Sequence, residues 1–353
     1  MSILQTGLFD ESNRLRDLSS LGDPLEKLNG VIDWGMFRPI LDGVFQKERN
    51  GSVGRPPYPY LLMFKILVLQ RLFNISDDQT EYQIKDRMTF MRFLGLSISD
   101  RVPDAKTIWL FRENLTNADV IKKLFDMFER QLARKGIITR SGSIIDASFV
   151  DAPRQRNTRD ENSLLKEGLI PEEWELPENA NKLRQKDVDA RWAKKGDETH
   201  YGYKVVPIVD ADSKLITDYA VVTANVHDST QIVDLFRPGK DKILYGDSAF
   251  AGGGIARSIK RKAASKKCQV ELRINEKGYK GIPLSKRQKA SNKKKSKVRC
   301  RVEHVFGYIS NSMRGMTLRT IGIARAKFNI GLTSLIYNMC RCTFLCRPAP
   351  VTG

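Results

Sequence analysis

The sequence contains no long hydrophobic run. Its most apolar stretch, residues 61–69, is interrupted by Lys65 and is far shorter than the roughly 20 apolar residues that a membrane-spanning helix needs. The first residues, Met1 to Gln5, lack the basic and apolar blocks of a signal peptide. These absences argue against a membrane protein, and we expect no membrane partner.

Cysteine is scarce, with five residues in a chain of 353. The number is odd, and three of the five, Cys340, Cys342 and Cys346, cluster near the end. No second pair stands at the spacing of a zinc finger, so we expect no zinc site. Reduced thiols in a cytoplasmic protein are the expected state.

Acidic residues are nearly absent from the last 77 positions, where Glu303 stands alone among 17 Lys and Arg. The whole chain has 60 Lys and Arg against 41 Asp and Glu, a net charge of +19. Between Arg257 and Arg301 there are 18 basic residues and two acidic ones. This concentration of charge predicts binding to nucleic acid or to an acidic surface, and binding that weakens strongly with salt.

Residues 1–136 have the pattern of a helical domain. An apolar run over 60–73 follows a cluster of glycine and prolines, and Ser76 with Gln79 fits a capping box that starts a helix toward Phe93. Thr116 and Asn117 are predicted to cap a longer helix that stops at Gly136. Short helices separated by turns fit a helix-turn-helix DNA reader and also fit a small bundle.

Residues 137–353 change to an α/β pattern. A short β-branched strand over 143–150 is followed by a polar insertion, residues 151–200, in which 22 of 50 positions are charged and residues 179–194 are predicted to form a helix. Two strands joined by a turn at Asp210 to Lys214 come next. Further elements are expected as a helix over 229–236, strands over 242–247 and 269–274, and a basic helix over 255–264. This order predicts a mixed α/β sheet.

Three carboxylates stand where they could carry chemistry. Asp247 follows an apolar strand, and ligands of open α/β sheets bind at the carboxyl ends of strands. Asp146 lies within the first strand, where a charge is costly unless it is paired or bound to a metal. Glu303 stands four residues after Arg299, so both project from one helix face. A structural ion pair would also explain Asp146 or Glu303.

Metal-dependent cleavage of a phosphodiester bond would require several carboxylates such as these three. Two Mg²⁺ ions about 3.5–4 Å apart can stabilise the attacking and the leaving oxygen of such a reaction. Mg²⁺ prefers oxygen ligands and is usually held by one or two carboxylates together with phosphate oxygens and water. Three acids that converge in a basic groove would meet these requirements.

The chain resembles the DDE transposases of bacterial insertion sequences, specifically the insertion-sequence-five-like branch. The resemblance extends over most of the length. In the N-terminal part it is carried by Gly54-Arg55-Pro56-Pro57-Tyr58, by residues 86–96, by Asp100-Arg101-Val102-Pro103-Asp104 and by Thr107-Ile108-Trp109. In the C-terminal part it is carried by Ile145-Asp146-Ala147, Asp189-Ala190-Arg191-Trp192, Tyr201-Gly202-Tyr203-Lys204, Val226-His227-Asp228-Ser229, Gly246-Asp247-Ser248 and Arg301-Val302-Glu303-His304.

The resemblance implies an RNase H-like catalytic domain over residues 137–353, built on a mixed five-stranded sheet flanked by helices, with the polar insertion 151–200 after the first strand. It implies an all-α domain over residues 1–136 that binds the element's DNA ends and supports dimerisation. Asp146, Asp247 and Glu303 then become the catalytic residues and the ligands of two Mg²⁺ ions, for which Mn²⁺ can substitute.

The implied function is transposition. The enzyme would bind the inverted-repeat ends of its own element, cleave them by Mg²⁺-dependent hydrolysis and transfer the 3′-OH ends to target DNA. Its partners would be double-stranded DNA and further copies of itself, in a homodimer or larger synaptic assembly at the bacterial nucleoid. A metal-dependent nuclease without strand transfer, and a non-catalytic DNA-binding regulator derived from a transposase, are the alternative functions.

The family signature around the glutamate is Tyr-x2-Arg-x3-Glu-x6-Lys, and this chain matches it only in the middle. Arg299 and Glu303 fit, whereas Ser296 and Ser310 replace the tyrosine and the lysine. The loss at Ser310 weakens the expected grip on the DNA end rather than the metal chemistry. Nearby cations can compensate for the lost charge, and the predicted DNA contacts here are Lys293, Lys294, Lys295, Lys297, Arg299 and Arg301.

Three further DNA contacts are predicted with open alternatives. Tyr203 and Lys204 fit base stacking and phosphate contact, or an ordinary edge strand. His227 could contact the DNA strand or make a local hydrogen bond. For Arg191 and Trp192, packing of the insertion and DNA contact remain equally open.

Overall fold

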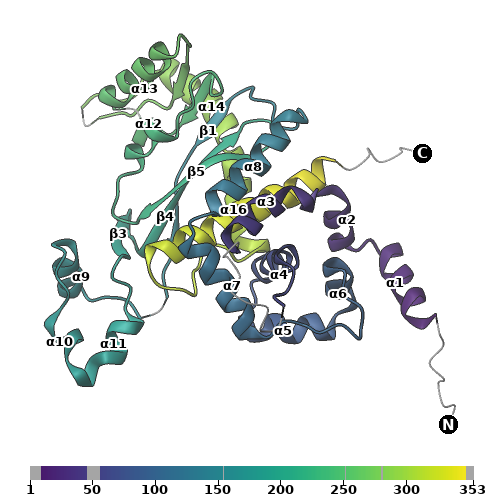
Figure 1. Cartoon of the computed structure of the whole chain (residues 1–353). Helices are drawn as coiled ribbons and strands as arrows, with labels where there is room; N and C mark the ends of the chain where they lie inside the picture. The colour runs from purple at the N-terminus through teal and green to yellow at the C-terminus, as the bar shows by residue number, and fades with distance from the viewer. Residues whose placement is uncertain (1–8, 46–55, 154, 251, 280, 347–353) are drawn as a thin grey trace, which may run out of the picture. The chain divides into compact units, whose positions relative to one another are not determined.

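The structure is a computed structural model that describes residues 9–45, 56–153, 155–250, 252–279 and 281–346 (Figure 1). Gly54 and Arg55 of the N-terminal motif lie outside the described residues. The chain divides into two compact units, Met1–Met127 with Met339–Gly353, and Phe128–Asn338. No helix among the described residues is long and apolar enough to cross a bilayer.

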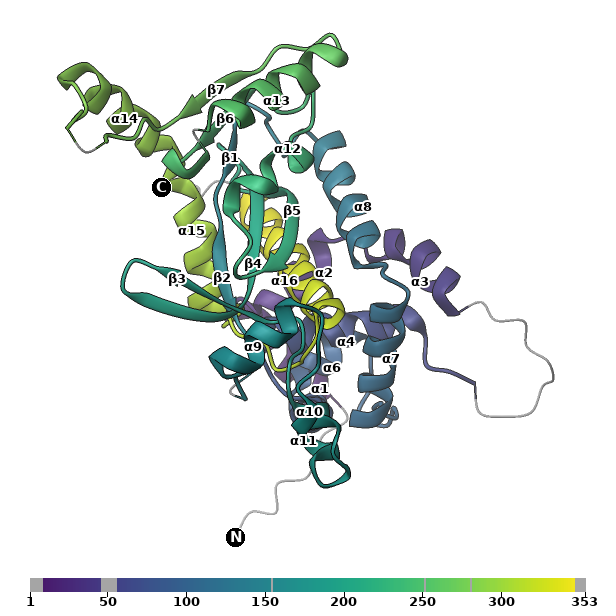
Figure 2. The same cartoon turned by 90° about the vertical axis from the view of Figure 1, so that its left-hand side faces the viewer.

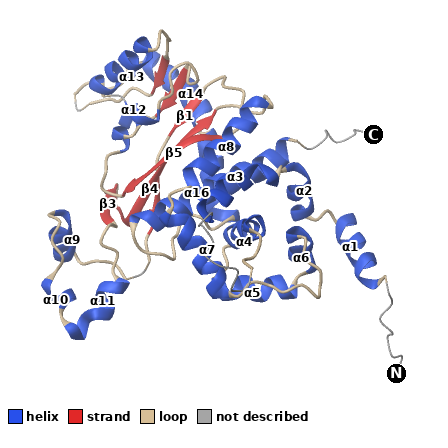
Figure 3. Ribbon diagram, in the orientation of Figure 1, coloured by secondary structure: helices blue, strands red, loops and turns tan. Residues whose placement is uncertain are grey.

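The first unit is helical in its described part (Figure 3). Its α-helices are α1 (Asp10–Ser20), α2 (Pro24–Val31), α3 (Arg38–Phe45), α4 (Tyr60–Phe73), α5 (Asp77–Asp86), α6 (Met88–Leu94) and α7 (Ala105–Asn117), and α8 (Ile121–Arg134) begins in it. Helix α4 is buried continuously from Met63 to Arg71, including Lys65, which explains why its sequence is apolar on every side. The predicted helix over 60–73 is therefore confirmed.

Two helix boundaries in this unit differ from the prediction. Ser76 caps α5 by accepting a hydrogen bond from the Gln79 N–H at 3.2 Å, as expected. The helix then ends at Asp86, because Arg87 is extended, with φ −110° and ψ 112°. Thr116 and Asn117 do not cap the next helix, since both lie inside α7 and α8 begins only at Ile121. Gly136, at φ +70°, does mark the end of α8.

The second unit is built on one mixed sheet. Its strands are β1 (Ser143–Ile145), β2 (Ser148–Asp151), β3 (Arg191–Lys195), β4 (Glu198–Asp210), β5 (Ile216–Thr223), β6 (Ile243–Gly246) and β7 (Glu271–Ile274). Strand β4 is antiparallel to β1, β2, β3 and β5, whereas β6 is parallel to β1 and β7 is parallel to β6. The predicted mixed sheet is thus confirmed.

The sheet has seven assigned strands where five were predicted. Strands β1 and β2 pair with β4 in one continuous register, Ile145 opposite Ile208 and Ser148 opposite Val205, so they are two halves of one segment. That segment is interrupted at Asp146 and Ala147. Strand β3, in the insertion, extends the sheet along the outer end of β4 (Figure 2). Counting β1 and β2 together, and leaving out β3 of the insertion, gives five strand positions in the order β5, β4, β1/β2, β6, β7.

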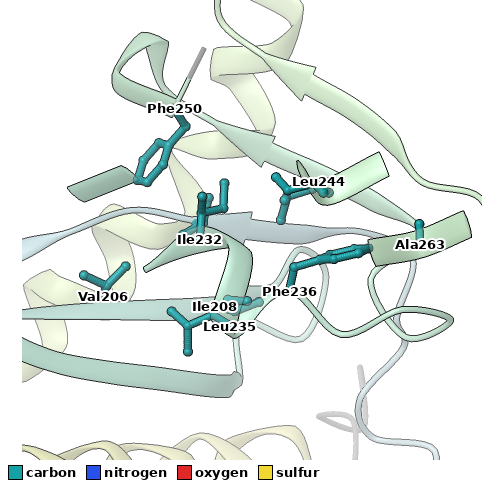
Figure 4. Packing of buried hydrophobic residues seen from close by; sticks show 10 residues of the cluster. Val206, Ile208, Ile232, Leu235, Phe236, Leu244, Phe250 and Ala263 are labelled. Atoms are coloured by element: carbon teal, nitrogen blue, oxygen red, sulfur yellow. The ribbon is translucent and has the colours of Figure 1, made fainter. Parts of the chain in front are cut away.

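Helices cover both faces of this sheet. Helix α12 (Ile232–Leu235) and helix α13 (Gly253–Ser265) pack on the face that carries Ile145 and Ile208 (Figure 4). On the opposite face, Val150 and Val205 line a small cavity together with Phe306 and Ile330, which places α15 (Arg301–Gly307) and α16 (Ile323–Leu345) there. Side chains alternate along a strand, so Asp146 projects to the opposite face from Ile145.

The insertion holds α9 (Arg159–Lys166), α10 (Glu172–Glu175), α11 (Ala180–Gln185) and β3. The predicted helix over 179–194 is wrong beyond Gln185. The Asp187 carboxylate accepts hydrogen bonds from the N–H groups of Asp189 and Ala190, both at 3.0 Å, and this turn replaces the helix. The chain then enters β3 and pairs with β4.

The remaining predicted elements are confirmed with small shifts of boundary. Asp210, the last residue of β4, accepts hydrogen bonds from the N–H and the hydroxyl of Ser213 in the turn that leads to β5. The predicted helix over 229–236 appears as a 3-10 turn, η3 (Asp228–Thr230), followed by α12. After β7 the chain forms α14 (Lys286–Arg299), α15 and a π-helical turn, η5 (Tyr308–Ser312), that contains Ser310.

Candidate active site

Asp146 occupies the interruption between β1 and β2. Its Oδ1 accepts a hydrogen bond from the Ala147 N–H at 2.9 Å, and its side chain is 18 % exposed. Burial raises the pKa of Asp146, while the Ala147 N–H and the Arg299 charge oppose that effect. The charge of Asp247 raises this pKa further. The Arg299 guanidinium supplies the positive charge beside this largely buried carboxylate.

Asp247 directly follows β6, as predicted, and its side chain accepts a hydrogen bond from the Ala249 N–H at 2.8 Å. The preceding residue, Gly246, is closely packed. A Cβ atom on Gly246 would lie 3.0 Å from Ile274, 3.2 Å from Phe250 and 3.3 Å from Ile145. Gly246 is thus tightly surrounded at the last position of β6, immediately before Asp247.

Arg299 lies between Asp146 and Glu303 and contacts both. Its Nη1 donates to Asp146 Oδ2 at 2.8 Å, and its Nη2 lies 3.9 Å from Glu303 Oε1. The predicted i,i+4 pair between Arg299 and Glu303 is thus present, although Cys300 separates α14 from α15. The Nε of Arg299 is buried without a hydrogen-bond partner among the described residues. The Arg299 guanidinium therefore contacts two carboxylates, while its Nε–H makes no hydrogen bond among the described residues.

The three acids do not form a closed metal site. Over the described part of the chain, no three His, Cys, Asp or Glu side chains lie together closely enough to hold a metal ion. The charge of Asp247 contributes to the raised pKa of Asp146, whereas Glu303 has a 65 % exposed side chain and is joined to Asp146 through Arg299. The oxygens of all three side chains are carboxylate oxygens, the ligand type that a hard divalent cation prefers. The Arg299 guanidinium is the positive charge that now lies between Asp146 and Glu303.

Helix α14 carries the predicted lysines on two different sides. Lys293, Lys294 and Lys297 are exposed and belong to a basic stripe that continues toward the start of the helix. Lys295 instead donates to the Ile274 carbonyl at 2.8 Å and lies 3.7 Å from Glu276. Its ammonium group fastens α14 to the end of β7, so only the other three present free charge to a polyanion.

Arg301 is also engaged by the protein. Its Nη1 donates to the Ala211 carbonyl at 2.6 Å and to Asp212 Oδ1 at 2.9 Å. The guanidinium thereby joins the start of α15 to the turn between β4 and β5. In this structure Arg301 has a structural role in addition to its predicted contact with DNA.

The structure contradicts the prediction that Tyr203 stacks on a base. Tyr203 has no exposed surface, and its hydroxyl donates to both carboxylate oxygens of Asp187 at 2.8 Å. Burial, together with the charge of Asp187, raises the pKa of this phenol far above its usual range. The ring lies inside because both faces of β4 are covered at this position, which a single-strand pattern could not reveal.

Lys204 and His227 make local contacts near the end of the sheet. The Lys204 ammonium donates to the Val226 carbonyl at 2.9 Å and to Asp228 Oδ1 at 2.8 Å. The His227 ring lies 2.6 Å from Ser229 Oγ and caps the η3 turn, which is the local hydrogen bond that sequence left open. The η3 turn contacts the η4 turn (Ser248–Phe250) that follows Asp247. Lys204 and His227 thus shape the loop beside Asp247.

Arg191 and Trp192 pack the insertion on the sheet. Arg191 donates to the carbonyls of Val188, Ala190 and Leu165, and the Trp192 indole donates to the Asn157 carbonyl at 2.8 Å. Sequence reasoning missed the residues that anchor this arrangement. Asp187 accepts from the Gly322 N–H at 3.1 Å, and Asp189 accepts from the Ile323 N–H at 2.8 Å at the start of α16. The motif around Asp189 was the available signal, but its partners lie over a hundred residues away.

The sheet carries acids at the carboxyl end of β6 and in the break after β1, and the strongly basic helix α14 contacts β6, an arrangement suited to contact with a polyanion. Comparison with known families gives the specific class. Residues 138–339, more than half of the chain, match the family model described as "Transposase DDE domain". Residues 13–114 match a second model, "Transposase domain (DUF772)". The chain belongs to the DDE transposase family and is of the insertion-sequence type.

The resemblance drawn from sequence motifs is confirmed at the level of the family, and the protein is a transposase enzyme that acts on DNA. Use of divalent metal ions is a general property of this family. Among solved structures, the chain is similar to one titled "Cryo-EM structure of piggyBac transposase synaptic complex with hairpin DNA (SNHP)". The identity is 13 %, the TM-score is 0.42, and the match covers 94 % of this chain and 76 % of that one. A likeness of this degree carries no weight for the fold or the function.

Proposed function

We propose that this transposase binds the inverted-repeat ends of its element, hydrolyses a phosphodiester bond at each end with Mg²⁺, and joins the freed 3′-OH ends to target DNA. The observation that carries the proposal is the Arg299 guanidinium held between Asp146 and Glu303, with Asp247 directly after β6, the strand that pairs in parallel with β1. Through Arg299, Asp146 from the break after β1 and Glu303 from α15, which are distant in sequence, lie near the same positive charge.

The catalytic unit is proposed to be RNase H-like. Support comes from the order β5, β4, β1/β2, β6, β7, in which β4 alone runs against its neighbours β1 and β5, and β6 and β7 are parallel to β1. Asp146 then belongs to the central segment β1/β2, and Asp247 follows the adjacent parallel strand, β6. Parallel neighbours end at the same edge, so this topology favours a shared site.

Asp146, Asp247 and Glu303 would hold the divalent ions. When bound, such ions supply a nucleophilic oxygen at neutral pH and stabilise the leaving oxygen. The chain's own contribution is positional. Gly246 packs closely just before Asp247, and the Ala147 N–H fixes one oxygen of Asp146.

Arg299 would alternate between two partners. Without bound ions it neutralises Asp146 and Glu303. If these carboxylates held divalent ions, the guanidinium, including its unsatisfied Nε, would be available to a DNA phosphate. The exposed stripe of Lys293, Lys294 and Lys297 would hold the flanking backbone.

The helical N-terminal domain, placed at residues 1–136 by sequence, would supply recognition of the DNA ends and contacts between protomers. Joining two ends to one target requires that both be held together, so we propose a homodimer or a larger synaptic assembly. The site of action would be the bacterial nucleoid.

The test is a donor plasmid that carries the element with its own ends, incubated with the full chain, Mg²⁺ and target DNA. We expect double-ended cleavage and joined product from the wild type, and neither from Asp247→Asn. Cleavage without joined product would indicate the nuclease alternative. Binding of the ends without any cleavage, equal in wild type and variant, would indicate the regulator alternative and defeat the proposal.

A further inference from the structure

The sequence predicts a DNA contact for Lys204, but the structure engages its ammonium group within the protein. The side chain is 11 % exposed, and Nζ donates to the Val226 carbonyl at 2.9 Å and to Asp228 Oδ1 at 2.8 Å. Nζ also lies 4.9 Å from the centre of the Phe149 ring. The backbone of Lys204 is paired on both sides, with Phe149 of β2 and Val222 of β5. A cation held in this way from inside the sheet is a fixed anchor for the loop that follows β5.

The loop held by this cation is closed by its own hydrogen bonds. The His227 ring accepts a hydrogen bond from the Ser229 N–H at 3.3 Å, and the Thr230 N–H donates to the His227 carbonyl at 3.1 Å. These bonds close the η3 turn, which begins at Asp228. Because the turn is bonded internally, an ion pair at Asp228 places the whole turn.

The η3 turn contacts the η4 turn, which follows Asp247 directly. In η4 the Ala249 N–H donates to Asp247 Oδ1 at 2.8 Å, and the Phe250 N–H donates to the Asp247 carbonyl at 3.2 Å. Phe250 belongs to the same buried cluster as Ile232 of α12, the helix that follows η3 (Figure 4). Lys204 is therefore connected to the Asp247 carboxylate through two turns that contact each other.

We propose that Lys204 and Asp228 are positioning residues for Asp247. Their ion pair holds η3 against η4, and η4 keeps the Ala249 N–H on one oxygen of the Asp247 carboxylate, which leaves the other oxygen for a divalent ion. The side chains of the pair are 11 % and 27 % exposed, so salt screens it less than it screens a surface pair. This inference deepens the proposed function and rests on it, because it takes Asp247 to be a metal ligand.

The first measurement is residue-resolved hydrogen exchange of the full chain without DNA or divalent ions. Lys204→Met should raise the exchange rates of the Thr230, Ala249 and Phe250 N–H groups about tenfold, because both turns lose the support of the ion pair. Lys204→Arg keeps the charge and should stay near the wild type. Asp228→Asn keeps an oxygen acceptor and should give a smaller rise at the same groups, which provides a second test if Lys204→Met does not fold.

The matched control is Lys194→Met. Lys194 is an exposed lysine of strand β3, so its replacement removes the same charge without touching either turn. Exchange at Ala249 and Phe250 should be the same in this variant as in the wild type.

Two measurements on the DNA complex separate positioning from a phosphate contact. The slope of log affinity against log salt should be the same in Lys204→Met and wild type, because an inward lysine displaces no counterions from DNA. The affinity for Mn²⁺, measured with DNA carrying the element's end, should fall about tenfold in Lys204→Met.

Wild-type exchange of the Ala249 and Phe250 N–H groups in Lys204→Met would overturn the proposal. A salt slope smaller by about one would also overturn it, since Lys204 would then contact a phosphate. Raised exchange with unchanged Mn²⁺ affinity would refute the role of the pair in metal binding. Because exchange needs neither metal nor cleavage, it tests the link from Lys204 to Asp247 even if the wild type binds no Mn²⁺, a result that would instead defeat the proposed function.

Discussion

Replacing Arg299 with alanine would remove the cation that contacts the Asp146 carboxylate, whose pKa burial already raises. The bond lost is a charge-assisted hydrogen bond of 2.8 Å to a carboxylate whose side chain is 18 % exposed. Hydrogen bonds to charged groups contribute about 1.5–3 kcal/mol. The hydrogen bond from the Ala147 N–H remains, so we expect a loss near the middle of this range, about 2 kcal/mol.

The assay is thermal unfolding in the absence of divalent ions, followed by the same measurement with Mg²⁺. For a unit of this size, about 2 kcal/mol corresponds to a fall in melting temperature of about 4–8 °C. Mg²⁺ should stabilise Arg299→Ala more than wild type, because the ion no longer competes with the guanidinium for the same oxygens. Arg299→Lys should lie between the two, since lysine keeps the charge but loses the planar fork.

The matched control is Arg287→Ala, an exposed arginine of the same helix. It removes one charge and one side chain without touching the acids. A fall in melting temperature no larger than that of the control, with an unchanged response to Mg²⁺, would refute the reasoning about Arg299.

Three further predictions concern packing, protonation and DNA binding. Gly246→Ala should destabilise the protein by about 1–3 kcal/mol and abolish cleavage, because the new Cβ lies 3.0 Å from Ile274; unchanged melting temperature and activity would contradict this. Lys65 is 9 % exposed and burial lowers its pKa from 10.5 to about 8, so the unfolded chain binds the proton more tightly and stability from this group rises between about pH 8 and 10.5. Lys65→Met should therefore be more stable than wild type at pH 7, by about 2 kcal/mol, with the difference shrinking toward pH 10.5 in parallel urea titrations. Lys293→Ala should reduce the slope of log affinity against log salt by about one in a DNA-binding titration, whereas Lys295→Ala, whose ammonium is turned inward, should leave the slope nearly unchanged.

Local signals in the sequence predicted much of the site. Asp247 follows an apolar strand, and the position of such strand ends is a property of a few consecutive residues. The pairing of Arg299 with Glu303 follows from helix periodicity alone. The second contact of Arg299, with Asp146, joins residues 153 positions apart, and only the fold supplies it. The sequence therefore predicted the candidate acids, but it could not predict that the Arg299 guanidinium contacts both Asp146 and Glu303.

The errors have the same origin. Residues 186–194 have the composition of a helix, yet Asp187 binds two successive N–H groups and the chain joins β4 as a strand. Tyr203 looked like an edge residue because its strand follows a polar insertion. Its burial depends on Asp187, a residue of that insertion. In both cases a tertiary contact outweighed the local pattern, which no single-segment argument could foresee.

The central claim is that Asp146, Asp247 and Glu303 bind divalent ions together when DNA occupies the site. The most direct measurement is binding of Mn²⁺ by electron paramagnetic resonance, with the full chain bound to DNA carrying the element's end. Wild type should bind Mn²⁺ in a site that Asp146→Asn, Asp247→Asn and Glu303→Gln each weaken, and added Mg²⁺ should displace it. Binding in Glu303→Gln equal to wild type would contradict the account, because the exposed glutamate would then have no part in the site.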